Sequence, residues 1–172
     1  MSAQEFDVQP LHATHDRAAF DCGVESLTEY LRTTAGQDLK RRAAVPYILV
    51  PLDEPTRVVG YYTLTSASIA LSDFPPDVSK KLAKYPNVPA TLLGRLAVNT
   101  ADKGQRHGER LLLDALSRSL AVSAHVGSVA VLVDPIDASA AAFYQRYGFT
   151  PFPDTPLRLF FPLKDVKASL TK

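Results

Sequence analysis

The amino-acid sequence predicts an α/β domain built on a mixed β-sheet. Segments rich in β-branched and aromatic residues alternate with segments whose apolar residues recur at helical spacing. No internal repeat, low-complexity tract or long linker interrupts this alternation. The 172 residues are enough for one domain with a sizeable core, so we expect residues 1–172 to form a single domain.

The N-terminal half is predicted to contain a strand, a helix and a hairpin. Residues 6–11 alternate in polarity, as a short strand does. A helix follows the turn at residues 21–23 and ends near residues 40–42, because the residues between them place one set of side chains on a single face. That set is Leu27, Tyr30, Leu31, Thr34 and Ala35. Residues 47–50 and 58–71 are rich in β-branched and aromatic side chains, and the turn-prone segment between them predicts a hairpin.

The C-terminal half is predicted to continue with helices and strands in turn. Residues 74–89 carry prolines and lysines, which indicates a loop with one helical turn, and residues 92–98 follow as a strand. The next helix has an apolar stripe at helical spacing, formed by Leu112, Ala115, Leu116 and Leu120. The apolar run over residues 129–133 is typical of a strand covered on both faces. A helix with Asp137 as its cap and Gly148 at its end follows, and residues 157–163 form the last strand.

The segment from Arg95 to Leu113 carries the clearest functional signal. It predicts a buried strand, a polar glycine-containing loop and an amphipathic helix, in that order. Free backbone N–H groups and the positive end of a helix dipole then lie at the end of a strand, where phosphate groups bind well. This signal is weak alone. The loop lacks the Gly-Lys-Ser/Thr ending of a P-loop, and the chain lacks the early glycine fingerprint of a dinucleotide fold.

Several motifs together resemble the GNAT acetyltransferase superfamily. They are Arg95-Leu96-Ala97-Val98, the loop after it, Leu111-Leu112-Leu113-Asp114-Ala115-Leu116 and Phe143-Tyr144-x-x-Tyr147-Gly148-Phe149. Further matches, Phe20-Asp21-Cys22-Gly23, Leu31-Arg32, Gln37-Asp38 and Val59-Gly60-Tyr61-Tyr62-Thr63-Leu64, make the chain similar to the GNAT toxins of bacterial type II toxin–antitoxin pairs. The resemblance covers nearly the whole chain. It implies a GNAT fold: a mixed, largely antiparallel central sheet with helices on both faces and a splayed strand pair that forms the acetyl-CoA cleft.

The resemblance implies acetyl-CoA as co-substrate. The family loop follows Gln/Arg-x-x-Gly-x-Gly/Ala, and its three defined positions align with Lys103, Arg106 and Gly108. Lys103 keeps a cationic group, whereas Arg106 replaces a glycine, so its side chain either crowds the diphosphate or reaches a phosphate oxygen. The implied diphosphate-binding residues are Lys103, Gly104, Gln105, Arg106, His107, Gly108 and Glu109. The backbone of Leu96, Ala97 and Val98 would receive the pantetheine arm like an added strand, and we expect the His107 side chain to be exposed to solvent.

By the same resemblance, Tyr144 is the general acid that protonates the departing thiolate. A phenol with a pKa of about 10 is protonated at neutral pH and has a proton to donate. Without the resemblance, Tyr144 would be interpreted as a packing residue beside Phe143 and Tyr147. No general base stands out, but an α-amino group titrates near pH 8, so a neutral fraction already exists and water can take the proton. The resemblance places a backbone N–H near Val98 against the oxyanion.

The implied acceptor is the α-amine of an aminoacyl-tRNA, whose acetylation would block translation. Basic residues that could contact the RNA backbone are Arg32, Lys40, Arg41, Arg42 and Arg95. A basic run at a helix end can equally be a solvated cap that favours the helix dipole. The formal net charge of +1 does not exclude a nucleic-acid partner, because a local patch can be basic.

The remaining titratable residues suggest no second chemistry. His12, His15 and His125 have no metal-ligand spacing with Cys22 or paired carboxylates, so we expect no metal site. The lone Cys22 is expected to be a small buried residue in the turn before the first helix. The absence of a long apolar run and of a signal-peptide pattern favours a cytoplasmic protein without a membrane span.

The resemblance also implies partners: a cognate ribbon-helix-helix antitoxin whose tail covers the cofactor cleft, and a second copy of the chain in a homodimer. Two alternatives stay open. The acceptor could be a small amine or a protein N-terminus, or Arg106 could have left a catalytically degenerate CoA-binding module.

Overall fold

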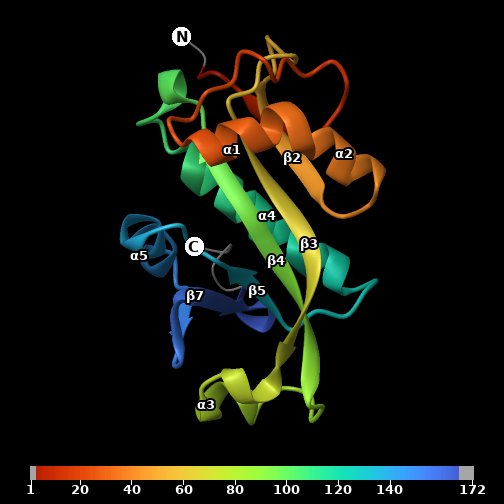
Figure 1. Ribbon diagram of the computed structural model, residues 1–172, viewed down its shortest axis with the longest axis vertical. Coiled ribbons are helices and arrows are strands. Elements are labelled where there is room, and N and C mark those ends of the chain that lie inside the picture. Colours follow the sequence, from red (N-terminus) through yellow and green to blue (C-terminus); the bar gives the residue numbers. More distant parts are fainter. Residues whose placement is uncertain (1–2, 167–172) are drawn as a thin grey trace. The chain divides into compact units, whose positions relative to one another are not determined.

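The computed structural model describes residues 3–166, and Figure 1 labels its main elements. The strands are β1 (Phe6–Pro10), β2 (Val45–Pro51), β3 (Gly60–Ala70), β4 (Asn87–Val98), β5 (Ala130–Val133), β6 (Thr150–Phe152) and β7 (Thr155–Pro162). The α-helices are α1 (Glu25–Glu29), α2 (Ala35–Lys40), α3 (Pro76–Ser79), α4 (His107–Ser123) and α5 (Ala138–Arg146). A π-helical turn, η1 (Tyr30–Thr34), joins α1 to α2, and 3₁₀ turns lie at η2 (Leu71–Asp73), η3 (Thr100–Asp102) and η4 (Leu163–Asp165).

The strands form one mixed sheet in the order β1-β2-β3-β4-β5-β7-β6. The pairs β1–β2, β2–β3, β5–β7 and β6–β7 are antiparallel, whereas β4 and β5 are parallel. The predicted mixed and largely antiparallel sheet is therefore confirmed.

The described residues divide into two compact units. The first takes the residues up to Thr65 together with Gly94–Ala115, and the second takes Ser66–Leu93 together with the residues from Leu116 onward. Strands β3 and β4 and helix α4 each run from one unit into the other. The single-domain boundaries 1–172 stay a prediction.

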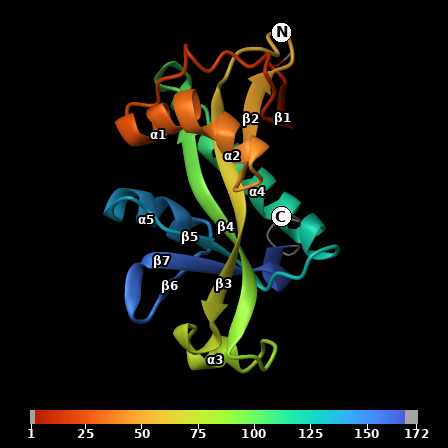
Figure 2. The ribbon, with the colours of Figure 1, turned by 45° about the vertical axis from the view of Figure 1, so that its right-hand side comes forward.

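In the first unit, neighbouring tyrosines on β3 show that helices cover both faces of the sheet. Successive side chains of a strand point to opposite faces. The hydroxyl of Tyr61 donates to the Leu27 carbonyl in α1 at 2.5 Å, and that of Tyr62 donates to Asp114 Oδ2 in α4 at 2.5 Å. Figure 2 shows α1 and α2 lying across β2 and β3.

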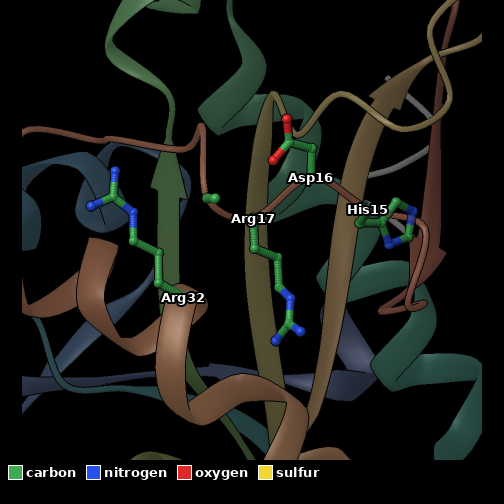
Figure 3. A pocket seen from close by; sticks show the side chains of 5 residues that line it. His15, Asp16, Arg17 and Arg32 are labelled. Carbon is green, nitrogen blue, oxygen red and sulfur yellow. The ribbon is translucent and has the colours of Figure 1, made fainter.

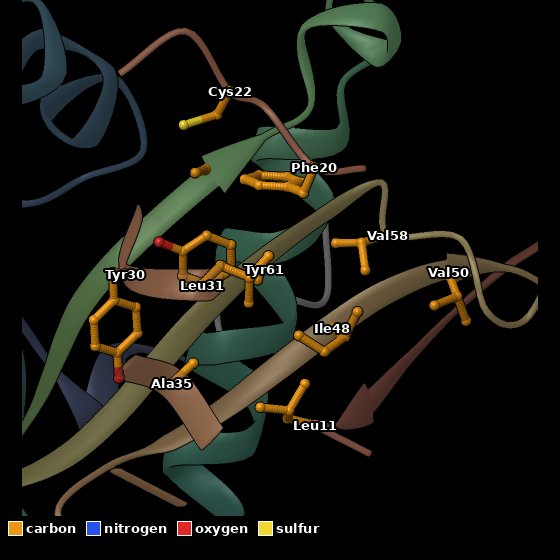
Figure 4. Close-up of a cluster of buried hydrophobic side chains, with 11 residues drawn as sticks. Leu11, Phe20, Cys22, Tyr30, Leu31, Ala35, Ile48, Val50, Val58 and Tyr61 are labelled. Atoms are coloured by element: carbon orange, nitrogen blue, oxygen red, sulfur yellow. The ribbon is translucent and has the colours of Figure 1, made fainter. Parts of the chain in front are cut away.

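The core of the first unit fills the face beneath α1, η1 and α2. Leu31 and Ala35 from these helical turns are fully buried against Ile48, Val50 and Tyr61 from the strands (Figure 4). The predicted hairpin is thus confirmed, and so is the predicted helical face except at Thr34, which is exposed because the π-helical turn shifts it off that face. The helix is not regular, because the N–H of Ala35 donates to the carbonyl of Tyr30, five residues back, which is a π-helical bond.

The second unit has its own aromatic core and the second predicted helix cap. Phe74, Phe152 and Phe160 are buried and have ring centroids about 5 Å apart. The Asp137 carboxylate accepts the N–H of Ala140 at 2.8 Å, so it caps α5 as predicted. Gly148 ends this helix with φ +100°, the left-handed conformation that glycine adopts without a steric cost.

Two elements differ from the sequence prediction. Strand β4 begins at Asn87, within the segment predicted as a loop, because Val88 and Ala90 alternate with exposed residues and are buried. Pro89 lacks an N–H, but its carbonyl still accepts the N–H of Val129 at 2.9 Å, so this end of the strand is paired. Strand β6 was not predicted, since three residues are too short to show a periodic pattern.

No helix within residues 3–166 is both long and apolar enough to cross a bilayer.

Gly60, at the start of β3, should not tolerate a side chain. A Cβ atom there would lie 2.7 Å from the Ala97 carbonyl oxygen and 2.9 Å from Leu111 Cδ1. We expect Gly60→Ala to lower the free energy of unfolding by about 1–3 kcal/mol, as overpacking of a tight core does. Urea denaturation measures it. The control Gly127→Ala, which meets no atom within 4 Å, should stay within about 0.5 kcal/mol of the original protein. Equal effects of the two changes would contradict the close approach.

Candidate functional site: a strand end, a glycine loop and a helix start

The loop between β4 and α4 is anchored residue by residue at its beginning. The side-chain oxygen of Asn99 accepts the N–H of Asp21 at 3.1 Å, and the N–H of Thr100 donates to the Asp21 carbonyl at 2.8 Å. The Lys103 ammonium donates to the Cys22 carbonyl at 2.9 Å. The start of the loop is therefore held against the turn that precedes α1.

The end of the loop turns sharply into α4. Gly104 has φ +83° and Arg106 has φ +62°, both in the left-handed region. The N–H of Arg110 donates to the Arg106 carbonyl at 3.0 Å, which is the first hydrogen bond of α4. The N–H groups of His107, Gly108 and Glu109 consequently have no carbonyl partner within the helix, and they lie at its positive end. This arrangement can bind a diphosphate.

Arg106 stands at the position that departs from the family pattern. Its φ of +62° is a conformation that glycine adopts without a steric cost, and its side chain is 88% exposed, 3.8 Å from the Glu109 carboxylate. The side chain therefore extends into solvent and does not crowd the packed part of the loop. Gly104 and Gln105 are also exposed, whereas Gly108 and Glu109 are half-buried.

The expectation of an exposed His107 side chain is wrong. Only 3% of this residue is exposed, and its ring packs edge-on against Phe6 of β1 at 4.6 Å between centroids. Neither ring nitrogen has a hydrogen-bond partner among the described residues. Burial, and then the nearby Arg110, lower the pKa of His107 below its ordinary value, so its ring is neutral at pH 7. What His107 offers a ligand is its backbone N–H.

A partly buried ion pair lies directly before the loop, and the sequence analysis missed it. Arg57 Nη1 donates to both carboxylate oxygens of Asp102, at 3.0 and 2.9 Å. The Asn99 side chain donates to the same carboxylate at 3.1 Å, and the Asp102 side chain is only 11% exposed. Arg57 also lies 3.7 Å from the exposed Glu54. Because 45 residues separate the partners, no local pattern in the sequence could indicate the pair.

The last part of β4 continues beyond its parallel partner. The ladder between β4 and β5 covers Thr91–Leu93 and ends at the pair Leu93–Val133, whereas β4 runs on to Val98. Ala97 is buried, and Leu96 and Val98 are half-buried. The close approach of Gly60 to the Ala97 carbonyl fixes this strand end in the first unit.

Tyr144, the predicted general acid, lies on α5 in the second unit. Its ring is buried beside Phe143 and Phe149, at 5.2 and 5.4 Å between centroids. Burial raises the pKa of Tyr144, so the phenol stays protonated throughout the physiological pH range.

Two arginines line a surface hollow in the first unit (Figure 3). The hollow has a volume of about 510 Å³ and is lined by His15, Asp16, Arg17, Ala18 and Arg32. Arg32 donates to the Phe20 carbonyl at 2.7 Å, and Arg17 Nη1 lies 3.0 Å from the point where a Gly36 Cβ would be. Neither arginine has a carboxylate partner within the described part of the chain. Sequence analysis found Arg32 but missed Arg17, which stands alone in a loop.

His15 contributes no charge to this hollow. Its Nδ1 accepts the N–H of His12 at 3.0 Å, so the ring hydrogen is on Nε2 and is donated to the Gln9 side-chain oxygen at 3.0 Å. Burial and the neighbouring His12 and Arg17 lower the pKa of His15, which agrees with a neutral ring. The Asp16 side chain also lines the hollow, and its Oδ1 accepts the N–H of Ala19 at 3.3 Å.

The other basic candidates differ in their surroundings. Arg95 is half-buried, with its guanidinium carbon 3.6 Å from the centroid of the Tyr30 ring, a cation–π contact. Lys40, Arg41 and Arg42 are exposed at the end of α2, where their charges also favour the helix dipole. An exposed position at a helix end fits both an RNA contact and a solvated cap of the helix.

Cys22 is buried as predicted, with its sulfur 3.3 Å from the Thr28 hydroxyl. Within residues 3–166, no group of three or more histidine, cysteine, aspartate or glutamate side chains is arranged to hold a metal ion.

Comparison with known proteins identifies two similar toxins. The chain is 30% identical over 169 residues to "Probable toxin TacT" of Sinorhizobium fredii, covering 94% of this chain and 93% of that protein. It is 34% identical over 153 residues to the "tRNA-acetylating toxin" of Mycobacterium tuberculosis, covering 89% of each. No family model matches the chain.

Solved structures agree with these relatives. AtaT complexed with acetyl-methionyl-tRNAfMet superposes with a TM-score of 0.88 at 30% identity, covering 98% of this chain and 100% of that one. A tyrosine-to-phenylalanine mutant of AtaT, bound to acetyl-CoA and the C-terminus of the antitoxin AtaR, has a TM-score of 0.81 at 27% identity, covering 98% of this chain and 99% of that one. The predicted fold class is confirmed, and the chain belongs to the GNAT toxins of bacterial toxin–antitoxin systems.

Proposed function

We propose that this protein is a toxin that transfers an acetyl group from acetyl-CoA to the α-amine of an aminoacyl-tRNA. The observation that carries this proposal is the start of α4, where N–H groups without helical partners follow a loop with two left-handed residues. The kinship with a tRNA-acetylating toxin and with AtaT, solved with an acetylated tRNA, supports the choice of acceptor. The acetyl-CoA-bound AtaT supports the choice of donor.

The diphosphate of acetyl-CoA is proposed to bind at residues 103–109. Its oxygens would accept the N–H groups at the start of α4, and the exposed Arg106 guanidinium, 3.8 Å from the Glu109 carboxylate, would reach a phosphate oxygen from there. Lys103 also braces the loop, because its ammonium donates to the Cys22 carbonyl at 2.9 Å. The backbone of Leu96, Ala97 and Val98 is proposed to receive the pantetheine arm.

The proposed reaction needs one proton removed and one supplied. The neutral amine attacks the thioester carbonyl, a backbone N–H near Val98 stabilises the oxyanion, and the C–S bond breaks to give a thiolate. Water removes the proton from the amine, and Tyr144 supplies one to the sulfur. A phenol is a weaker acid than a thiol by about 1.5 pKa units, so full transfer in water costs about 2 kcal/mol. Burial raises the pKa of Tyr144, and it raises the pKa of the departing thiol for the same reason, so burial does not widen the difference between the two acids. We propose that the proton moves as the C–S bond breaks, when negative charge develops on the sulfur.

The tRNA is proposed to bind along the basic side of α1, η1 and α2. Arg32 and Arg17 at the hollow, Arg95 on Tyr30, and Lys40, Arg41 and Arg42 at the end of α2 all belong to the first unit. Arginine guanidinium groups match the geometry of phosphate oxygens, and those of Arg17 and Arg32 have no carboxylate to satisfy within the described residues.

Regulation is proposed to follow the toxin–antitoxin pattern. A cognate antitoxin of the ribbon-helix-helix type would cover the cofactor site with its tail, and a homodimer would widen the surface offered to tRNA. The AtaT complex with the AtaR C-terminus supports an antitoxin as partner. The expected compartment is the cytoplasm, where charged tRNA is found.

Labelled acetyl-CoA separates the proposed acceptor from its alternatives. Incubation with charged tRNA should label the aminoacyl group, whereas labelling of small amines or protein N-termini without labelling of charged tRNA would contradict the proposal. A flat calorimetric titration with millimolar acetyl-CoA would instead show that the loop does not bind the cofactor and would favour a non-enzymatic binding module.

Removing the Tyr144 hydroxyl should separate catalysis from binding. We expect Tyr144→Phe to keep its affinity for acetyl-CoA and to lower kcat about 100-fold or more, because general acid catalysis contributes on this scale. Calorimetry and single-turnover acetylation of charged tRNA measure the two quantities. Tyr147→Phe, the same change three residues further along, should keep most activity. Unchanged turnover of Tyr144→Phe would remove Tyr144 as the acid.

Restoring the family glycine at Arg106 should relieve backbone strain. A left-handed non-glycine residue costs roughly 1–2 kcal/mol, part of which glycine loses again as chain entropy. We therefore expect Arg106→Gly to raise the free energy of unfolding by about 0.5–1 kcal/mol, whereas the control Gln105→Gly lowers it. Chemical denaturation measures both. A loss of acetyl-CoA affinity in Arg106→Gly of more than about tenfold would show that the guanidinium binds phosphate.

The hollow lined by Arg17 and Arg32 should contribute to RNA binding and not to acetyl-CoA binding. We expect Arg17→Gln combined with Arg32→Gln to raise the KM for charged tRNA about tenfold and to leave the KM for acetyl-CoA unchanged. The slope of log RNA affinity against log salt concentration should fall by about one for each phosphate contact that is lost. Filter binding over a salt series measures the slope. The control Lys81→Gln, an exposed lysine of the second unit, should change neither quantity. A double variant with unaltered tRNA affinity would exclude the hollow.

A further inference from the structure

We propose that Arg57 and Asp102 form a positioning pair for the diphosphate loop, in which Arg57 cancels a negative charge that would otherwise oppose acetyl-CoA. The proposal rests on the proposed function, since it assumes that the loop after Asp102 binds the diphosphate. Neither residue belongs to the motifs that indicate the GNAT family.

The first step is the place of Asp102. This residue ends η3, and the diphosphate loop begins at the next residue, Lys103. A carboxylate here is a fixed negative charge next to a site for a doubly negative group. Burial makes that charge matter more, because a side chain that is 11% exposed is poorly screened by water. An uncompensated Asp102 would therefore repel the diphosphate.

The second step is the compensation. Arg57 lies before β3, and its Nη1 bridges both carboxylate oxygens at 3.0 and 2.9 Å. The Asn99 side chain supplies a third hydrogen bond at 3.1 Å. Charge-assisted hydrogen bonds of this length are strong, and the pair is nearly neutral as a unit. The loop thus gains a rigid anchor without a net negative charge.

The third step concerns the other hydrogen bonds that hold residues 99–103. Asn99 joins the Asp102 carboxylate to the N–H of Asp21, and Lys103 joins the loop to the Cys22 carbonyl. With residues 99–103 held in this way, the left-handed residues Gly104 and Arg106 alone turn the chain into α4. Because Asn99 and Lys103 hold the loop through these other bonds, the effect of the pair on acetyl-CoA is mainly that of its charge.

The test is a charge cycle measured by calorimetry with acetyl-CoA. We expect Arg57→Gln to weaken binding about tenfold, because it leaves the Asp102 carboxylate unpaired beside the diphosphate. Asp102→Asn should bind as well as the original protein or better. The double variant should return to within about threefold of the original, since it removes both charges together. The KM for acetyl-CoA should follow the same order while kcat at saturation stays unchanged.

A purely structural role predicts a different pattern. In that case Asp102→Asn would weaken binding as much as Arg57→Gln, the double variant would not recover, and the proposal would be overturned. Binding by Arg57→Gln within twofold of the original would also overturn it. Glu54→Gln, which removes the exposed carboxylate 3.7 Å from Arg57, is the matched control and should leave affinity unchanged. If Arg57→Gln does not fold, Arg57→Lys replaces it, and the expected rise in Kd is smaller because the charge is kept.

The same experiment keeps the two proposals apart. If the unaltered protein does not bind acetyl-CoA, the proposed function fails. If it binds and the cycle shows no coupling between Arg57 and Asp102, only the positioning pair fails.

Discussion

The central constraint in this protein is the abrupt passage from β4 into α4. A strand that ends beside its neighbour and a helix that begins a few residues later leave a short segment in which the backbone must reverse. Gly104 and Arg106 make the reversal in left-handed conformations, and the first helical hydrogen bond is made only by the N–H of Arg110. The polar groups left over at that point are the ones that a diphosphate can satisfy. The proposed cofactor site is thus a consequence of how the helix has to start.

Much of the fold could be predicted because its signals are local. The cap at Asp137, the left-handed Gly148 and the apolar stripe of α4 each depend on residues within a few positions of one another. The failures have the opposite origin. His107 is polar and lies in a loop, so its sequence predicts exposure, yet packing against Phe6, 101 positions earlier, buries it. Strand β4 begins early because its pairing with distant segments outweighs the local signal of Pro89.

The candidate site divides in the same way. The loop, the basic end of α2 and Tyr144 were found from contiguous motifs. Arg57 and Arg17 were not, since neither has a neighbour in the sequence that marks it. Arg57 pairs with Asp102, and the guanidinium of Arg17 occupies the space beside Gly36, which has no side chain. The tertiary fold alone brings each arginine to these residues. Sequence reasoning identified most groups that are proposed to touch the ligands, but it missed Arg17 among them and missed Arg57, which pairs with Asp102 before the loop.

Charge pairing explains how a chain with 19 basic and 18 acidic residues could serve two polyanionic ligands. Coulombic attraction depends on local rather than net charge. Asp102, directly before the loop, is paired with Arg57, and Glu109 in the first turn of α4 lies 3.8 Å from Arg106. Arg17 and Arg32, by contrast, have no carboxylate partner within the described residues. Acids are neutralised where the diphosphate is proposed to bind, and cations are left unpaired where RNA is proposed to bind. Replacing one member of the Arg57–Asp102 pair should therefore alter the affinity for acetyl-CoA without altering the affinity for tRNA.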